Sequence, residues 1–150
     1  MKGFLFILSS ILVIAFACSK DKFKTKPTLD IKSFNTKNIQ VGNDLNVNLE
    51  FTDKEGDVDS VIYVIRQRIN RRAPLTRNND YTVPSFPKTT RGEILVSLDN
   101  ARQLTQGFST ISLPGSQVQD DTMNIKFVLK DRAGNTSDTA VLTNVVIKRQ

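Results

Sequence analysis

The sequence predicts an all-β protein, a two-sheet antiparallel sandwich of about seven strands that begins near Pro27. After that proline, apolar side chains recur at every second position in short runs, which is the period of a strand with one buried face. Glycine, asparagine, aspartate and proline separate these runs, as turns between strands require. No segment of useful length repeats its apolar residues with the 3.6-residue period of a helix.

The first half of the domain contains three predicted strands, the first at residues 28–34. The clearest strand covers 45–51, where polar residues alternate with four apolar ones: Leu45, Val47, Leu49 and Phe51. A turn over 53–57 then leads to a long strand at 58–68. Residues 70–90 contain three prolines and no clear pattern, so we expect a long loop there.

The second half contains shorter strand candidates at 92–98 and 108–113, separated at 99–106 by what is at most a single helical turn. A second clean alternation runs over 123–129, and the last strand is predicted at 138–148. The alternation assigns three sets of residues to the core: Val61, Tyr63 and Ile65; Ile125, Phe127 and Leu129; and Val141, Thr143, Val145 and Ile147.

Two turn sequences carry a resemblance to a known class of domain. They are Phe-Thr-Asp-Lys-Glu-Gly-Asp at 51–57 and Asp-Arg-Ala-Gly-Asn at 131–135. With the strand pattern around them, the chain resembles the immunoglobulin-like domains of bacterial lipoproteins. The resemblance implies an immunoglobulin-like β-sandwich over 27–150. It implies no catalytic activity, because many domains of this kind are adhesive or structural.

The N-terminal residues predict export from the cytoplasm. Lys2 precedes an apolar stretch at 4–17, and Cys18, the only cysteine of the chain, follows directly. This stretch is shorter than the roughly 20 residues of a membrane-spanning helix. A positive residue, a short apolar core and small residues before a cleavage point are typical of a signal peptide, here 1–17.

Cleavage before Cys18 has two interpretations, an ordinary secreted protein or a lipoprotein. Ala17-Cys18 resembles the end of a bacterial lipobox, which implies a diacylglycerol on the Cys18 thiol. Residues 18–26 are polar and rich in lysine, as a tether should be. We adopt the lipoprotein interpretation because an unpaired thiol is unusual in an oxidising compartment. With Ser19-Lys20-Asp21 directly after the cysteine, the chain resembles lipoproteins of Bacteroidota-type bacteria, which implies a place in the cell envelope, at the outer membrane, on its periplasmic face or at the cell surface.

Composition excludes several classes of function. The chain has 21 lysine and arginine residues, 15 aspartate and glutamate residues and a net charge of +6, but no histidine. Histidine-based acid–base chemistry, catalytic triads and most zinc or copper sites are therefore excluded. The net positive charge is not accompanied by a nucleic-acid-binding motif in the sequence, and an exported protein rarely meets nucleic acid. We predict a protein that is not an enzyme and needs no cofactor, apart from a structural calcium ion considered next.

The immunoglobulin-like topology would gather acidic turn residues at the end of the sandwich where the tether enters. Several oxygen ligands in one place suit Ca²⁺, whereas acidic residues in turns also occur simply because they form tight, solvated turns. Both interpretations stay open for the same residues: Asp53, Glu55, Asp57, Asp59 and Asp131.

The opposite end is predicted to be basic. Arginines pair with carboxylate and phosphate groups, so this end is a candidate site for an acidic glycan or an acidic envelope protein. The competing interpretation is a solvated loop that keeps the domain soluble. The candidate residues are Arg66, Arg68, Arg71, Arg72 and Arg77.

These observations predict a membrane-anchored envelope lipoprotein that acts as a binding, adhesion or accessory module. Two alternatives remain. One is a structural subunit of an envelope assembly that pairs through an exposed strand, and the other is a domain that calcium merely stiffens.

Overall fold

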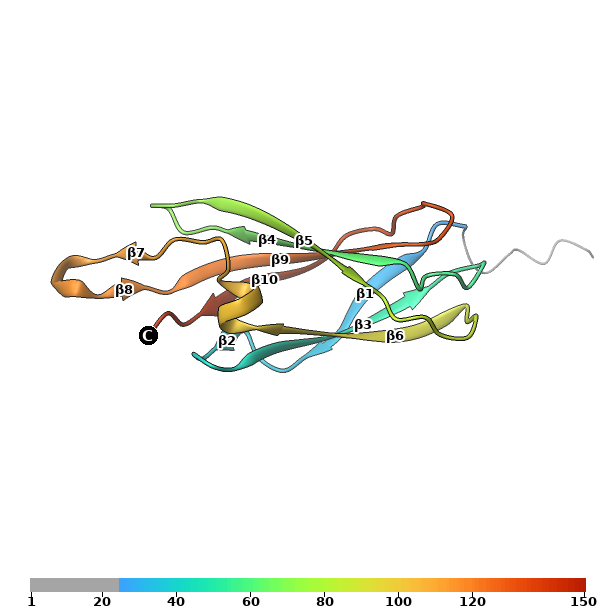
Figure 1. Cartoon of the computed structure of the whole chain (residues 1–150), viewed down its shortest axis with the longest axis horizontal. Helices are drawn as coiled ribbons and strands as arrows, with labels where there is room; N and C mark the ends of the chain where they lie inside the picture. The colour runs from blue at the N-terminus through green and yellow to red at the C-terminus, as the bar shows by residue number, and fades with distance from the viewer. Residues whose placement is uncertain (1–24) are drawn as a thin grey trace, which may run out of the picture.

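The computed structural model describes residues 25–150, which form an elongated arrangement of strands with very little helix (Figure 1). The predicted signal peptide and the lipidated cysteine lie outside the described residues, as does all but the end of the predicted tether. No helix within 25–150 is both long and apolar enough to cross a membrane. The strands are β1 (Thr28–Phe34), β2 (Asn38–Ile39), β3 (Asp44–Thr52), β4 (Val61–Arg68), β5 (Leu75–Thr82), β6 (Arg91–Asp99), β7 (Ile111–Ser112), β8 (Val118–Gln119), β9 (Asp121–Lys130) and β10 (Ala140–Ile147).

Two sheets form the body of the domain, so the all-β prediction is confirmed. One sheet has three strands in the order β1-β3-β6, and the other has five in the order β2-β10-β9-β4-β5. A short hairpin of β7 and β8 projects beyond them (Figure 1). The pairs between neighbouring long strands are antiparallel, and only the short β2 runs parallel to β10.

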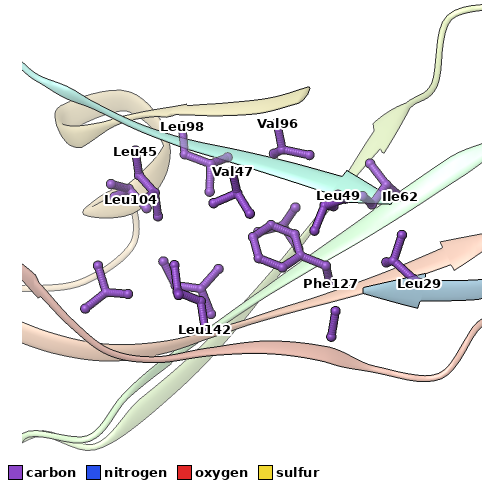
Figure 2. Packing of buried hydrophobic residues seen from close by; sticks show 14 of the residues in the cluster. Leu29, Leu45, Val47, Leu49, Ile62, Val96, Leu98, Leu104, Phe127 and Leu142 are labelled. Atoms are coloured by element: carbon purple, nitrogen blue, oxygen red, sulfur yellow. The ribbon is translucent and has the colours of Figure 1, made fainter. Parts of the chain in front are cut away.

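The core lies between the two sheets and follows from the alternation of β3 and β9. The apolar residues of β3 point inward, whereas its asparagines lie nearer the solvent. In Figure 2, Leu45, Val47 and Leu49 of β3 face Phe127 and Leu142 of the other sheet. All five are at most 3% exposed, so burial of apolar surface is the main force holding the sheets together.

The prediction of a loop over residues 70–90 is wrong for its central part. Strand β5 occupies Leu75–Thr82 and pairs with β4 along the whole length of both strands. Its residues Thr-Arg-Asn-Asn-Asp-Tyr-Thr offer no apolar alternation, because β5 is the edge of its sheet and most of its side chains meet solvent. Seven strands of seven or more residues are present, as predicted, but β5 takes the place of the strand predicted at 108–113.

That region instead contains β7, which is only two residues long and pairs with β8. The helical turn predicted at 99–106 is confirmed as one turn at Asn100–Leu104. Asp99 starts this turn by accepting a hydrogen bond on its side chain from the backbone N–H of Arg102 at 2.6 Å.

The predicted buried face of β4 is wrong by one residue. Ile62 and Val64 are buried, whereas Val61, Tyr63 and Ile65 are only partly covered. Apolar residues occupy both faces at the start of this strand, so alternation alone could not choose between them.

The core residues predicted in β10 are right for Val145 and Ile147 and wrong for Val141 and Thr143. The pairing of β10 with β9 shifts register between Leu142 and Val145. Asn144, at φ +57°, forms the irregularity that moves the buried face from even-numbered to odd-numbered positions.

Candidate metal centre

The turn between β3 and β4 and the turn between β9 and β10 meet at one end of the sandwich (Figure 1). Val61 at the start of β4 pairs with Lys130 at the end of β9, which sets the two turns side by side. Thr28 pairs with Thr52, so the chain reaches the sandwich at this same end. We call it the acidic end, and its central residues are Asp53, Asp57 and Asp131.

These three carboxylates form a tight cluster. Each offers one oxygen, and the three oxygens lie within 4.8 Å of one another. Asp53 is 0% exposed and Asp131 is 2% exposed, while Asp57 is partly covered. Carboxylates are rarely buried without a partner, since removing a charge from water is costly. Three carboxylates this close together are therefore stabilised by a compensating positive charge or a bound proton.

Local hydrogen bonds hold two of the carboxylates in position. Asp53 Oδ2 accepts the backbone N–H groups of Gly56 at 2.7 Å and Asp57 at 3.3 Å. Gly56 has φ +67°, and a Cβ atom there would lie 3.0 Å from the backbone nitrogen of Thr89. Only glycine suits this combination of backbone angle and space. The turn sequence thus fixes the direction in which Asp53 points.

The second turn holds Asp131 in the same manner. Its Oδ1 accepts the backbone N–H of Asn135 at 2.7 Å, and its Oδ2 accepts the side-chain amide of the same residue at 2.8 Å. The two turns are joined directly, because Arg132 donates its backbone N–H to the carbonyl of Asp57 at 3.1 Å. The cluster therefore spans two segments that are distant in sequence.

Two oxygens of the cluster have no hydrogen-bond partner among residues 25–150. They are Asp53 Oδ1 and Asp57 Oδ1, and both atoms are buried. Burial raises the pKa of the Asp57 carboxyl above its ordinary value, and the negative charges of Asp131 and Asp53 raise it further. A cation between these oxygens would satisfy both of them and remove the repulsion.

The donor set selects the kind of ion. All three candidate ligands are carboxylates, and hard cations such as Ca²⁺ and Mg²⁺ prefer oxygen. Ca²⁺ tolerates irregular geometry, whereas Mg²⁺ demands a near-ideal octahedron and retains its waters. Ligands from two separate turns therefore fit Ca²⁺ better.

The other two acidic candidates lie outside the cluster. Glu55 is exposed at the surface of the turn. Asp59 is engaged elsewhere, since it accepts hydrogen bonds from the hydroxyl of Ser85 at 2.9 Å and the guanidinium of Arg132 at 2.6 Å. The structure therefore narrows five candidate ligands to three.

At the opposite end, two of the five predicted surface arginines are buried. Arg66 is 3% exposed and Arg68 is 2% exposed, so the prediction that they present charge to a partner is wrong. They continue the inward face of β4 beyond Ile62 and Val64. Both guanidinium groups lie over the ring of Phe108, each 5.3 Å from its centre.

Each buried arginine is bound by groups that the sequence pattern does not show. Arg66 donates to the carbonyls of Leu104 and Gln106, both at 3.1 Å. Arg68 forms an ion pair with Asp121 Oδ1 at 3.1 Å, and Asp121 is itself 0% exposed. Asp121 also accepts a hydrogen bond from Arg149 at 2.7 Å. These contacts join β4, β9 and the residues that follow β10.

Three arginines of the predicted basic end remain exposed: Arg71, Arg72 and Arg77. The first two lie in the turn after β4, and we call this the distal end of the sandwich. Arg77 lies on the edge strand β5 and donates to the carbonyl of Gly107 at 3.2 Å.

Comparisons with known proteins do not assign the chain to a family. No family model matches it, and no curated protein matches it either. Among solved structures it is similar to a β-glucosidase from Listeria innocua in complex with gluconolactone, with a TM-score of 0.39 and 12% identity. The match covers 79% of this chain but 16% of that protein. At that TM-score the likeness carries no argument about fold family or activity.

Proposed function

We propose that this protein is a lipid-anchored, non-catalytic module of the bacterial cell envelope that binds Ca²⁺ at the acidic end. The observation that carries the cation site is the pair of buried, unpartnered oxygens of Asp53 and Asp57 beside Asp131. The ion would join the two turns and stiffen the end at which the chain enters the sandwich. Its role there is structural, because two of the three ligands, Asp53 and Asp131, are buried and the chain has no histidine for acid–base chemistry.

The proposed anchor is a diacylglycerol on Cys18, followed by the tether at 18–26. The structure supports this orientation in one respect, since Thr28 begins β1 at the acidic end. The cation would then lie at the end of the domain that carries the tether, and the distal end would lie at the other. The order β1-β3-β6 against β10-β9-β4-β5 supports an immunoglobulin-like sandwich for the domain.

Native mass spectrometry of the folded, metal-free chain in dilute Ca²⁺ tests the cation site. We expect one ion per chain, and we expect the Asp53→Asn variant to take up much less at the same Ca²⁺ concentration. Glu55→Gln is the matched control, because it removes the same charge from the same turn outside the cluster. Equal uptake by Asp53→Asn and the wild type would contradict the proposal.

The exposed arginines of the distal end favour a second function, capture of an acidic ligand. We expect the double variant Arg71→Glu/Arg72→Glu to lose binding to a polygalacturonate column that retains the wild type at low salt. Retention should weaken as salt rises, since exposed charges are screened. Lys88→Glu is the control at another exposed site. Unchanged retention of the double variant would contradict this function.

A further inference from the structure

Strand β6 is an open edge of the three-stranded sheet. It pairs with β3 in an unbroken register along Arg91–Asp99, and no described strand lies on its other side (Figure 1). Proteins usually protect such an edge with proline, lysine or a bulge. The central part of β6 has none of these; its one charged residue is Glu93, and residues 83–86 lie beside it at Glu93, Ile94 and Leu95.

The hydrogen bonds at its two ends show which residues face outward. Thr90 accepts the backbone N–H of Asp53, and Asn100 donates its backbone N–H to the carbonyl of Asn43. Both pairs continue the β3–β6 register, so even-numbered residues direct their backbone groups toward β3. Odd-numbered residues therefore direct theirs toward the open edge.

The outer groups at the two ends of β6 are already engaged. Thr89 Oγ1 donates to the carbonyl of Arg91 at 2.6 Å, and Gln103 Oε1 accepts the backbone N–H of Asp99 at 2.8 Å. Between these ends, no hydrogen bond from within 25–150 reaches the outward backbone groups of Glu93, Leu95 and Ser97. The unpaired edge thus consists of three alternate residues.

Apolar surface accompanies this edge on both faces of the sheet. Leu95 is 68% exposed, the largest exposure of any large hydrophobic side chain in the described chain. On the inner side, a pocket of about 180 Å³ runs between β6 and the end of β5, lined by apolar residues that include Tyr81, Val83, Ile94 and Val96. An open edge with apolar surface on both sides is suited to an added strand.

We propose that β6 pairs antiparallel with β6 of a second copy of this chain, about a two-fold axis through Leu95. In this register Glu93 faces Ser97 of the second copy, and Leu95 faces its own counterpart. All of these are odd-numbered, so their free backbone groups meet and form hydrogen-bonded pairs. Each copy contributes the same surface, as a two-fold interface requires.

The charges and the apolar groups are complementary in this register. Arg91 lies opposite Asp99 of the second copy at both ends of the paired region, which sets opposite charges across the strands. Within its own chain Arg91 also pairs with Glu50 at 3.1 Å, and Asp99 Oδ1 accepts the backbone N–H of Arg102. The two Leu95 side chains cover each other on the outer face. On the inner face, Ile94 and Val96 of the second copy lie toward the pocket beside β6. A shift of register by two residues loses both the charge pairing and the leucine contact.

The pair is compatible with anchoring on one membrane, a point that rests on the proposed lipid anchor. In the first copy the chain enters the sandwich at the level of Arg91. In the second copy it enters opposite Asp99 of the first, and these two levels are about 26 Å apart along a strand. The eight residues between Cys18 and Pro27 reach about 28 Å when extended. Both anchors can therefore insert in the same membrane when the pair lies on its side.

Disulfide trapping tests the register. The chain is produced from residue 18 with Cys18→Ser, which removes its only cysteine. In this background Leu95→Cys should cross-link to itself under mild oxidation, because the paired Cα atoms are about 5.5 Å apart. Ser97→Cys is the matched control on the same face, since its two copies would be about 13 Å apart. A mixture of the Glu93→Cys and Ser97→Cys variants should cross-link, while neither does so alone.

Sedimentation equilibrium measures the association itself. We expect a concentration-dependent dimer, and Leu95→Lys should raise its dissociation constant at least about tenfold by opposing two like charges. Leu95 is exposed, so this variant should fold normally. The pairing needs no cation and should persist in a chelator, which separates it from the Ca²⁺ site. A chain that stays monomeric at millimolar concentration, or equal cross-linking of Leu95→Cys and Ser97→Cys, would overturn the proposal.

Discussion

Replacing Asp121 with asparagine is expected to lower the free energy of unfolding by about 3–5 kcal/mol. Asp121 is fully buried and binds two cations, Arg68 at 3.1 Å and Arg149. The substitution leaves Arg68, itself 2% exposed, as a buried charge without a carboxylate. Removing one member of a buried ion pair is more damaging than never having had the pair, because the remaining charge stays desolvated.

The neighbouring Asp120 provides the control. It pairs with Lys148 at 2.7 Å, but both side chains are about one-third exposed, at 32% and 33%. Asp120→Asn should therefore cost about 1 kcal/mol or less. Urea unfolding of the two variants, followed by circular dichroism, measures the difference. Equal losses for Asp120→Asn and Asp121→Asn would show that the buried pair is not what holds the distal end together.

Replacing Asp57 with asparagine is expected to change stability in opposite directions with and without Ca²⁺. In metal-free protein the variant should be more stable than the wild type, since one of three clustered negative charges is gone. With Ca²⁺ at 100 times its dissociation constant, the wild type should gain about 2.7 kcal/mol. The variant should lose most of that gain, because its remaining ligands carry less charge.

The raised pKa of Asp57 determines whether the stability of the metal-free protein rises or falls with pH. Burial and the charges of Asp131 and Asp53 raise this pKa in the folded state, so the folded chain holds the proton more tightly than the unfolded chain. This contribution to stability is fully present below the ordinary aspartate pKa. It is lost as pH rises through the raised value. Metal-free protein should therefore lose stability over this window, and the effect of Ca²⁺ should grow as the proton leaves.

Thermal unfolding of the wild type and Asp57→Asn from pH 4 to pH 8, in Ca²⁺ and in chelator, measures these effects. Glu55→Gln is again the control, since it removes an exposed charge from the same turn. Its melting curves should follow those of the wild type in both conditions. If Asp57→Asn is less stable than the wild type in chelator, the clustered charges are not in conflict and the premise of the cation site fails.

Sequence pattern predicted the strands in which alternation is clean and one face is buried. In β3 and β9 apolar and polar residues alternate, so both the strand and its buried face could be predicted. In β4 apolar residues occupy both faces, and pairing with β5 and β9 decides which one is buried. Strand β5 has no apolar alternation of its own and depends on its hydrogen bonds to β4.

At the candidate sites, too, the sequence predicted some features and missed others. Topology and composition predicted that Asp53, Asp57 and Asp131 would meet, but not which acidic residues of the turns would point outward. The burial of Arg66 and Arg68 could not be predicted, because charge normally indicates the surface. The groups that bind them lie far away in sequence, in the helical turn at Asn100–Leu104, at Phe108 and at Asp121.

The central claim is that three carboxylates at the acidic end hold a cation, and diffraction from crystals grown in Ca²⁺ tests it most directly. The account predicts an anomalous peak among Asp53, Asp57 and Asp131, with oxygen distances of about 2.3–2.6 Å. Asp53 Oδ1 and Asp57 Oδ1 should both be ligands. The absence of such a peak in saturating Ca²⁺, with Asp57 sharing a proton with Asp53 instead, would contradict the account.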